Sequence, residues 1–213
     1  MTPLGKCLVF NLKYPAEMDH LYWKPEDGGE EPDLDGLADA ENVRAMVRIV
    51  GDRAAEQAGT FLEQCAEKIA AHWRGLKVGK VTGQTRRQRM ADYWEFQGRL
   101  RVKSPKGLSI WYGAFIDEVE AQIIPWLYGR GGRNWEDLAI RKLGKQRAHS
   151  RAGDGAVSDR GTVALACISL LPEGLHGFDV DSDPLVKKVV ACFTAIGAKD
   201  MEALAQPVGV DDG

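Results

Sequence analysis

The sequence predicts an α+β fold in which an antiparallel β-meander or hairpin sheet packs against a long amphipathic helix and shorter C-terminal helices. Two observations carry this prediction. Apolar residues recur at gaps of three and four from about Asn42 to Trp73, which is the pattern of one helix face. Segments 93–102 and 108–117 alternate apolar and polar residues around a turn with proline and glycine, which is typical of a β-hairpin.

Length and composition are those of an ordinary globular chain. The 213 residues are 44% apolar and 28% charged, which suits one domain over residues 1–213 with a sizeable core. We expect mobile segments at 24–41, 145–161 and 207–213, where polar residues, glycine and proline gather. Met1 to Leu12 lacks the features of a signal peptide and no long apolar run is present, so a soluble cytoplasmic protein without membrane contact is expected.

The N-terminal third is expected to supply a strand and the long helix. Lys6–Tyr14 holds an apolar run followed by alternation and stops before Pro15, which favours a strand. In the long helix Gly51 allows a kink or break and Gly75 suits the C-terminal end. The apolar stripe of this helix is expected to pack on the sheet. The following segment, 75–91, is predicted to be a basic connecting loop.

The hairpin carries the strongest signal in the chain. Apolar side chains take every second position on both sides of the turn at 103–107. Its register is predicted as well, because a slip by one residue would break every apolar pairing. Counting from Val102 opposite Leu108, the expected pairs are Leu100 with Ile110, Gly98 with Tyr112, Phe96 with Ala114 and Trp94 with Ile116.

The C-terminal half is expected to add a third strand and three helices. Gln122–Tyr128 alternates, and Pro125 within it suggests an edge strand or a bulge. Residues 162–171 form a buried segment that periodicity alone does not assign to strand or helix. Helices are predicted where a capping residue or loop precedes an apolar period, at Asn134–Leu143, Asp183–Ile196 and Asp200–Gln206.

The net charge of −3 conceals a strong asymmetry along the chain. Residues 1–72 carry 7 basic and 14 acidic side chains, residues 73–151 carry 17 and 7, and residues 152–213 carry 4 and 10. A basic middle third between acidic ends is either a solvated mosaic or a localised anion-binding surface.

The second face of the hairpin interleaves cations with aromatic rings. In the predicted register Arg99 lies opposite Trp111, and Glu95 lies opposite Phe115. Such a face stacks bases and holds phosphates in proteins that bind single strands. The alternative interpretation is structural: a second helical layer covers Trp111 and Phe115, and Arg99 stacks on Trp111 as a cation–π contact.

No cofactor, metal or catalytic motif survives a check of its spacing. Residues 179–183 open like an EF-hand loop, but Pro184 and Val190 stand where that loop needs glycine and glutamate. Residues 129–133 precede a helix as phosphate loops do, yet they lack the P-loop ending and are followed by Glu136. The four cysteines are scattered and are expected to be core thiols, and no serine, cysteine or histidine stands in a nucleophile context.

Function is therefore predicted from a charge pattern rather than from a motif. The sequence favours a non-enzymatic binding protein that contacts DNA, RNA or a nucleoprotein complex through the basic, aromatic-bearing region 74–151. A protein–protein adaptor or inhibitor using acidic flanking segments stays open, and so does an enzyme whose site assembles only in space. The predicted nucleic-acid-binding residues are Arg86, Arg87, Arg89, Arg99, Arg101, Trp111, Phe115, Arg130, Arg133, Lys145 and Arg147.

Overall fold

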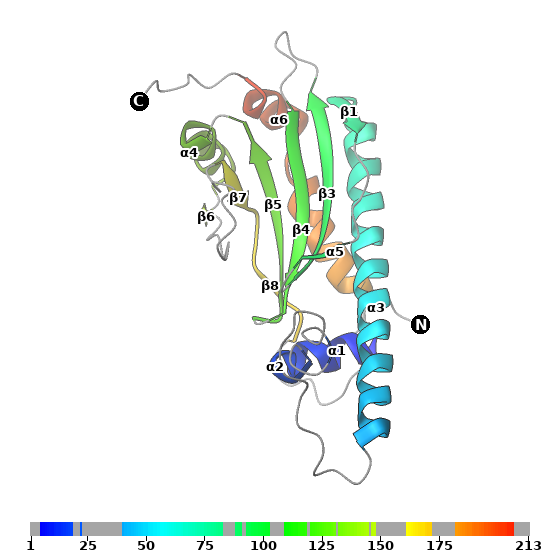
Figure 1. The fold of residues 1–213 in the computed structure, drawn as a ribbon. Helices are drawn as coiled ribbons and strands as arrows, with labels where there is room; N and C mark the ends of the chain where they lie inside the picture. Colours follow the sequence, from blue (N-terminus) through cyan, green and yellow to red (C-terminus); the bar gives the residue numbers. More distant parts are fainter. Residues whose placement is uncertain are drawn as a thin grey trace.

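An antiparallel sheet, one long helix and shorter C-terminal helices make up the fold, which is the predicted α+β class (Figure 1). Of the segments predicted to be mobile, residues 24–39, 145, 148–160 and 207–213 lie outside the described part of the chain. The structure is a computed structural model that describes residues 5–18, 22, 40–82, 88–90, 93–102, 109–118, 120–130, 132–144, 146–147, 161–171 and 182–206.

The first element is a helix, so the prediction of a strand at Lys6–Tyr14 is wrong. α1 spans Lys6–Lys13 and is followed by the short α2 at Pro15–Met18. An apolar run as short as this one suits a strand or a buried helix equally, and packing against α3 decides between them. One side of α1 is buried, with Leu8, Val9, Asn11 and Leu12 at helical spacing.

α3 spans Ala40–Leu76 without interruption and is the predicted long helix (Figure 1). There is no break at Gly51, where the helix instead packs against the ring of Tyr22, whose atoms would lie 2.7 Å from an added Cβ. The apolar stripe packs on β3 and β1 as predicted, and also on α1 and α5. None of the described helices combines the length and the apolar character that crossing a membrane requires.

Within the described residues the sheet has eight strands, all antiparallel, in the order β1-β3-β4-β5-β7-β6, with β2 also paired to β3 and β8 to β5. Two of them correct the prediction of a loop over 75–91, because strands of three or four residues are too short to show a period. The first six strands are β1 (Gly79–Thr82), β2 (Gln88–Met90), β3 (Tyr93–Val102), β4 (Ser109–Asp117), β5 (Gln122–Gly129) and β6 (Gln146–Arg147).

The hairpin of β3 and β4 has the predicted register throughout its described length. Leu100 lies opposite Ile110 and Trp94 opposite Ile116, so the apolar side chains of the two strands share one face. Gly98 lies opposite Tyr112, whose ring atoms would be 2.3 Å from a Cβ on the glycine. The small residue is therefore needed for this aromatic ring to lie across β3.

β5 is the third predicted strand, but it is an interior strand rather than an edge. It pairs with β4 on one side and with β7 (Thr162–Ala164) and β8 (Ile168–Ser169) on the other. The backbone O of Pro125 accepts a hydrogen bond from Leu165 N at 2.7 Å, so the missing N–H of the proline points to the same side. That side is the interval between β7 and β8, where no ladder bond is lost. The proline is thus accommodated by a break in the neighbouring strand.

The three predicted C-terminal helices are present, each beginning one or two residues earlier than expected. They are α4 (Gly132–Leu143), α5 (Ser182–Thr194) and α6 (Ala198–Leu204). Asn134 and Asp183 consequently lie in the first helical turn and not at the cap. Gly144 follows α4 with a φ of +59°, the left-handed conformation that glycine adopts readily after a helix.

The core lies between the sheet and the layer formed by α3 and α5 (Figure 1). Tyr112 of β4 packs edge-on against Phe193 of α5, with ring centroids 6.1 Å apart. At the end of β5 the indole of Trp135 lies on Gly129, and its Nε1 donates a hydrogen bond to Leu204 O at 2.8 Å. These contacts fix α4, α5 and α6 to the same face of the sheet.

Replacing Gly129 with alanine should lower the free energy of unfolding by about 1–3 kcal/mol, because the new methyl group would lie 2.1 Å from the Trp135 ring. Urea denaturation measures the change. Gly75→Ala is the matched control: no atom lies within 4 Å of its added Cβ, so stability should be unchanged or higher by up to about 1 kcal/mol. Equal stability of the two variants would contradict this account.

Candidate functional site

The face of the sheet turned away from α3 and α5 carries side chains in rows that cross the strands. Because residues alternate between faces, the partners of one row are set by the register. We call this surface the open face. From the end where β3 finishes, its rows are Lys80, Arg101 and Ser109; then Arg99, Trp111 and Tyr128; then Gln97, Gly113 and Trp126; then Glu95, Phe115 and Ile124; and last Asp117 and Gln122.

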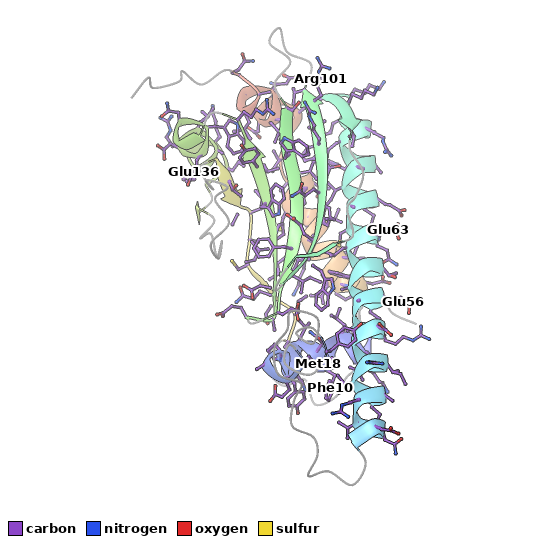
Figure 2. All side chains as sticks on the ribbon, in the orientation of Figure 1. Phe10, Met18, Glu56, Glu63, Arg101 and Glu136 are labelled. Atoms are coloured by element: carbon purple, nitrogen blue, oxygen red, sulfur yellow. The ribbon has the colours of Figure 1, made fainter. Side chains whose placement is uncertain are left out.

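Cations gather at the first end of the open face. Lys80 of β1 and Arg101 of β3 are register partners, and both are exposed. Arg101 lies at the end of β3, as Figure 2 shows. Arg130 is exposed directly after β5, whose last residue Gly129 pairs with Ile110 of β4 at this same end. Three exposed cations from three different segments therefore lie at the same end of the sheet, next to the row of the half-buried Arg99.

Arg99 and Trp111 lie opposite each other as predicted, and the guanidinium carbon is 5.4 Å from the centroid of the Trp111 ring. A cation–π contact of this kind stabilises by about 0.5–2 kcal/mol. Both side chains are half-buried, as are Phe115 and Tyr128. In the part of the chain that the structure describes, α3 and α5 pack on the opposite face of the sheet. Among the described residues, Arg99 Nε is a buried donor with no hydrogen-bond partner.

A carboxyl group lies in the middle of the aromatic part of the open face. Glu95 accepts a hydrogen bond from Gln97 Nε2 at 3.1 Å and another from the indole of Trp126. Trp126 reaches β3 by crossing β4 at Gly113, where the indole would lie 2.6 Å from an added Cβ. Burial of the Glu95 carboxyl raises its pKa from 4.5 to about 7, against the lowering effect of both hydrogen bonds.

Acidic residues gather at the other end of the open face. Asp117 accepts a hydrogen bond from Glu120 N at 3.1 Å, which closes the turn between β4 and β5. Glu118 is buried in this turn and accepts a hydrogen bond from Asn11 Nδ2 of α1 at 2.8 Å. Charge is therefore separated along the strands, from a basic end to an acidic end, within the middle third of the chain.

The structure brings together four of the predicted nucleic-acid-binding residues on the open face and places a fifth, Arg130, beside its basic end. The four are Arg99, Arg101, Trp111 and Phe115. Arg86, Arg87 and Lys145 lie outside the described residues. Arg89, Arg133 and Arg147 belong to β2, α4 and β6, but their side chains are not described.

Sequence reasoning placed Glu95 on this face without giving it a role, and it missed Lys80, Trp126 and Tyr128 as members of this surface. The alternation within Gln122–Tyr128 was a usable signal for the two aromatic residues, because Ile124, Trp126 and Tyr128 occupy one face of a strand. Nothing in the sequence pointed to Lys80, since β1 has only four residues. The pKa of Glu95 depends on Trp126 crossing Gly113, which is a contact between strands and leaves no local pattern.

A second surface, which we call the apolar end, is formed by exposed apolar side chains of α1, of the residue that follows it and of the first turns of α3. Phe10 and Tyr14 are 37% and 43% exposed, with ring centroids 4.9 Å apart. Met46 and Ile49 of α3 are 65% and 61% exposed. Exposed apolar residues that gather on neighbouring elements are typical of surfaces that contact another protein.

The predicted core position of the cysteines holds for one of them and not for another. Cys65 is a buried core thiol whose pKa is raised by burial to about 12, whereas Cys167 is exposed. Within the described ranges no three His, Cys, Asp or Glu side chains group closely enough to hold a metal ion.

Comparisons of the chain with protein-family models, with curated proteins and with solved structures found no match.

Replacing Glu95 with glutamine should flatten the pH dependence of stability. The folded state keeps the Glu95 proton up to a pKa of about 7, whereas the unfolded chain releases it near 4.5, so the stabilisation is full below about pH 4.5 and declines as the pH rises through 7. From acid to neutral pH, the free energy of unfolding of Glu95→Gln should rise by about 1–2 kcal/mol relative to that of the wild type. The effect is limited to this size because water screens the partly exposed carboxyl.

Urea denaturation across this pH range measures the effect, with Glu202→Gln at an exposed position of α6 as the charge-matched control. The control should keep the slope of the wild type. Parallel pH profiles for the wild type and Glu95→Gln would show that the carboxyl titrates normally.

Proposed function

We propose that the chain is a non-enzymatic binding protein that contacts nucleic acid, alone or in a nucleoprotein complex, through the basic end of the open face. The observation that carries the proposal is the grouping of exposed Lys80, Arg101 and Arg130 around the Arg99–Trp111 stack. The cations would bind phosphates, and the planar groups would support bases.

Single-stranded DNA or RNA is the form of nucleic acid that this surface fits best. A flat sheet with half-exposed rings offers stacking partners to bases whose faces are free, and a duplex hides those faces. Trp111 and Tyr128 are register partners on adjacent strands, so two rings lie next to each other in one row. The row of cations begins immediately beside them.

The acidic end of the open face limits where the backbone of a bound strand can lie. Asp117 and the turn that follows would repel phosphates, so the backbone of a bound strand would run across the basic end and not along the whole length of the strands. Binding would therefore depend on a few cations at one end of the sheet rather than on the net charge of the chain.

Removing two of these cations should weaken binding and reduce its dependence on salt. If Lys80, Arg99, Arg101 and Arg130 each neutralise one phosphate, log K should fall against log salt with a slope of about −3 for a single strand. Lys80→Ala/Arg101→Ala should reduce the magnitude of that slope by about 1.4. Fluorescence anisotropy with labelled oligothymidine across a range of salt concentrations measures both slopes.

The matched control is Lys187→Ala/Lys188→Ala, which removes the same charge from exposed positions on α5, in the layer behind the sheet. Its slope should equal that of the wild type. Equal slopes for both double variants would place the contact elsewhere, and absence of binding at low salt would overturn the proposed function.

Loss of the Trp111 ring should weaken binding without changing the salt slope. Stacking of one base contributes about 1–3 kcal/mol, so Trp111→Ala should lower affinity by roughly tenfold or more. Anisotropy measures the affinity, and thermal unfolding shows whether the variant remains folded. Tyr14→Ala, which removes an exposed ring from α1, should bind as the wild type does. Equal affinities of Trp111→Ala and wild type would exclude stacking on this ring.

A second candidate function is a protein–protein contact, which the apolar end on α1 and α3 favours. Phe10, Tyr14, Met46 and Ile49 expose apolar surface there that the rest of the chain does not cover. The acidic segments 26–41 and 173–183, invoked for an adaptor or inhibitor, lie almost wholly outside the described residues. This candidate takes precedence if the chain fails to bind nucleic acid at low salt.

A further inference from the structure

The fourth row of the open face holds a carboxyl group placed among apolar and aromatic side chains. Glu95 lies opposite Phe115 on β4, and Ile124 of β5 follows in the same row. The Trp126 ring lies next to this row on the side of the basic end, because it crosses Gly113 to reach Glu95. A hydrogen-bonding group is thus set in a mostly apolar surround, about two rows from the Arg99–Trp111 stack.

The partners of Glu95 fix its position and leave it able to accept further hydrogen bonds. Gln97 Nε2 donates to Oε2, and the Trp126 indole donates one more bond. An ionised carboxylate has about four acceptor positions, so about two remain after these contacts. With its charge on one carboxyl group and no hydrogen to donate, an ionised Glu95 would select for a ligand edge that offers adjacent N–H donors.

We infer that Glu95, held by Gln97 and Trp126, is a base-selecting site for guanine in a bound single strand. The inference rests on the proposed function, because it takes the strand to be anchored by phosphates at the basic end. At about 3.4 Å per residue, Glu95 lies roughly 14 Å along β3 from Arg99, far enough for a base to reach the carboxyl while its neighbours contact the cations.

Guanine is the base whose edge matches a carboxylate. Its N1–H and its 2-amino group are neighbouring donors that a carboxylate accepts together. Adenine and cytosine each place an acceptor nitrogen beside their amino group, and thymine or uracil offers one N–H between two carbonyls. The half-buried Phe115 lies beside the carboxyl and would contact the base on an apolar face, while the buried Trp126 holds the carboxyl from behind. Bases read at their Watson–Crick edge in this way are typical of single-strand recognition.

The ionisation of Glu95 makes the selection depend on pH. Because the pKa of this carboxyl lies at about 7 in the folded chain, the acceptor form dominates above neutrality and the protonated form below it. The other groups on the open face around it are Asp117 and Gln122 in the next row and Arg99 two rows away on the same strand; β2 pairs with Glu95 through Gln88. Guanine preference should therefore rise as the pH rises from about 6 to about 8.

The experiment compares three labelled oligonucleotides that differ at one position: oligothymidine, the same strand with one central guanine, and the same strand with inosine, which lacks the 2-amino group. Anisotropy at about pH 8 should give about tenfold tighter binding for the guanine strand than for the other two. At about pH 6 the three affinities should converge. Glu95→Gln should bind the three strands with equal affinity at both pH values.

Glu120→Gln is the matched control, because it removes one carboxylate from the turn beyond the acidic end of the same face and should keep the guanine preference. Equal binding of guanine and inosine strands by the wild type, or a guanine preference that survives in Glu95→Gln, would overturn the inference and leave the proposed function standing. Failure of every strand to bind at low salt would overturn both.

Discussion

The register of β3 against β4 is the constraint on which the rest of the structure depends. Side chains alternate between the two faces of a strand, so a slip of β3 by one residue against β4 would send Leu100 to the open face and bring Arg99 into the core. Burial against α3 and α5 excludes that arrangement, because it would place a guanidinium among apolar side chains without compensation. The packing that stabilises the fold therefore also decides which residues form the candidate site.

Glycines let aromatic rings lie flat across neighbouring strands on both faces of this sheet. Tyr112 covers Gly98 on the core side, and Trp126 covers Gly113 on the open side. In each case a Cβ on the glycine would overlap the ring, so the small residue is a condition for the contact rather than a source of flexibility. The crossing at Gly113 also carries the indole of Trp126 to Glu95, which links sheet packing directly to the pKa of a carboxyl group.

Sequence patterns predicted the parts of the fold whose periods are long enough to read. The hairpin register, the helix α3 and the three C-terminal helices follow from alternation or helical spacing over at least seven residues. The short apolar run of α1 fits a strand and a helix equally, and contacts with Gln57 and the rest of α3 decide for the helix. The same limit applies to the site: Arg99, Trp111 and Glu95 follow from the predicted register, whereas Lys80 and Trp126 join them through strands that pair only in the folded chain.

The open face is ordered before any ligand arrives, and this has a consequence for binding. Arg99 already stacks on Trp111, and Glu95 is already held by Gln97 and Trp126. Side chains fixed in this way lose little conformational entropy when a ligand binds, so more of the contact energy appears as affinity. The same mutual contacts leave the rings only half-exposed, which lowers the apolar area presented to water in the free chain. The Arg99–Trp111 stack and the hydrogen bond from Trp126 to Glu95 therefore hold these side chains in place in the unliganded fold.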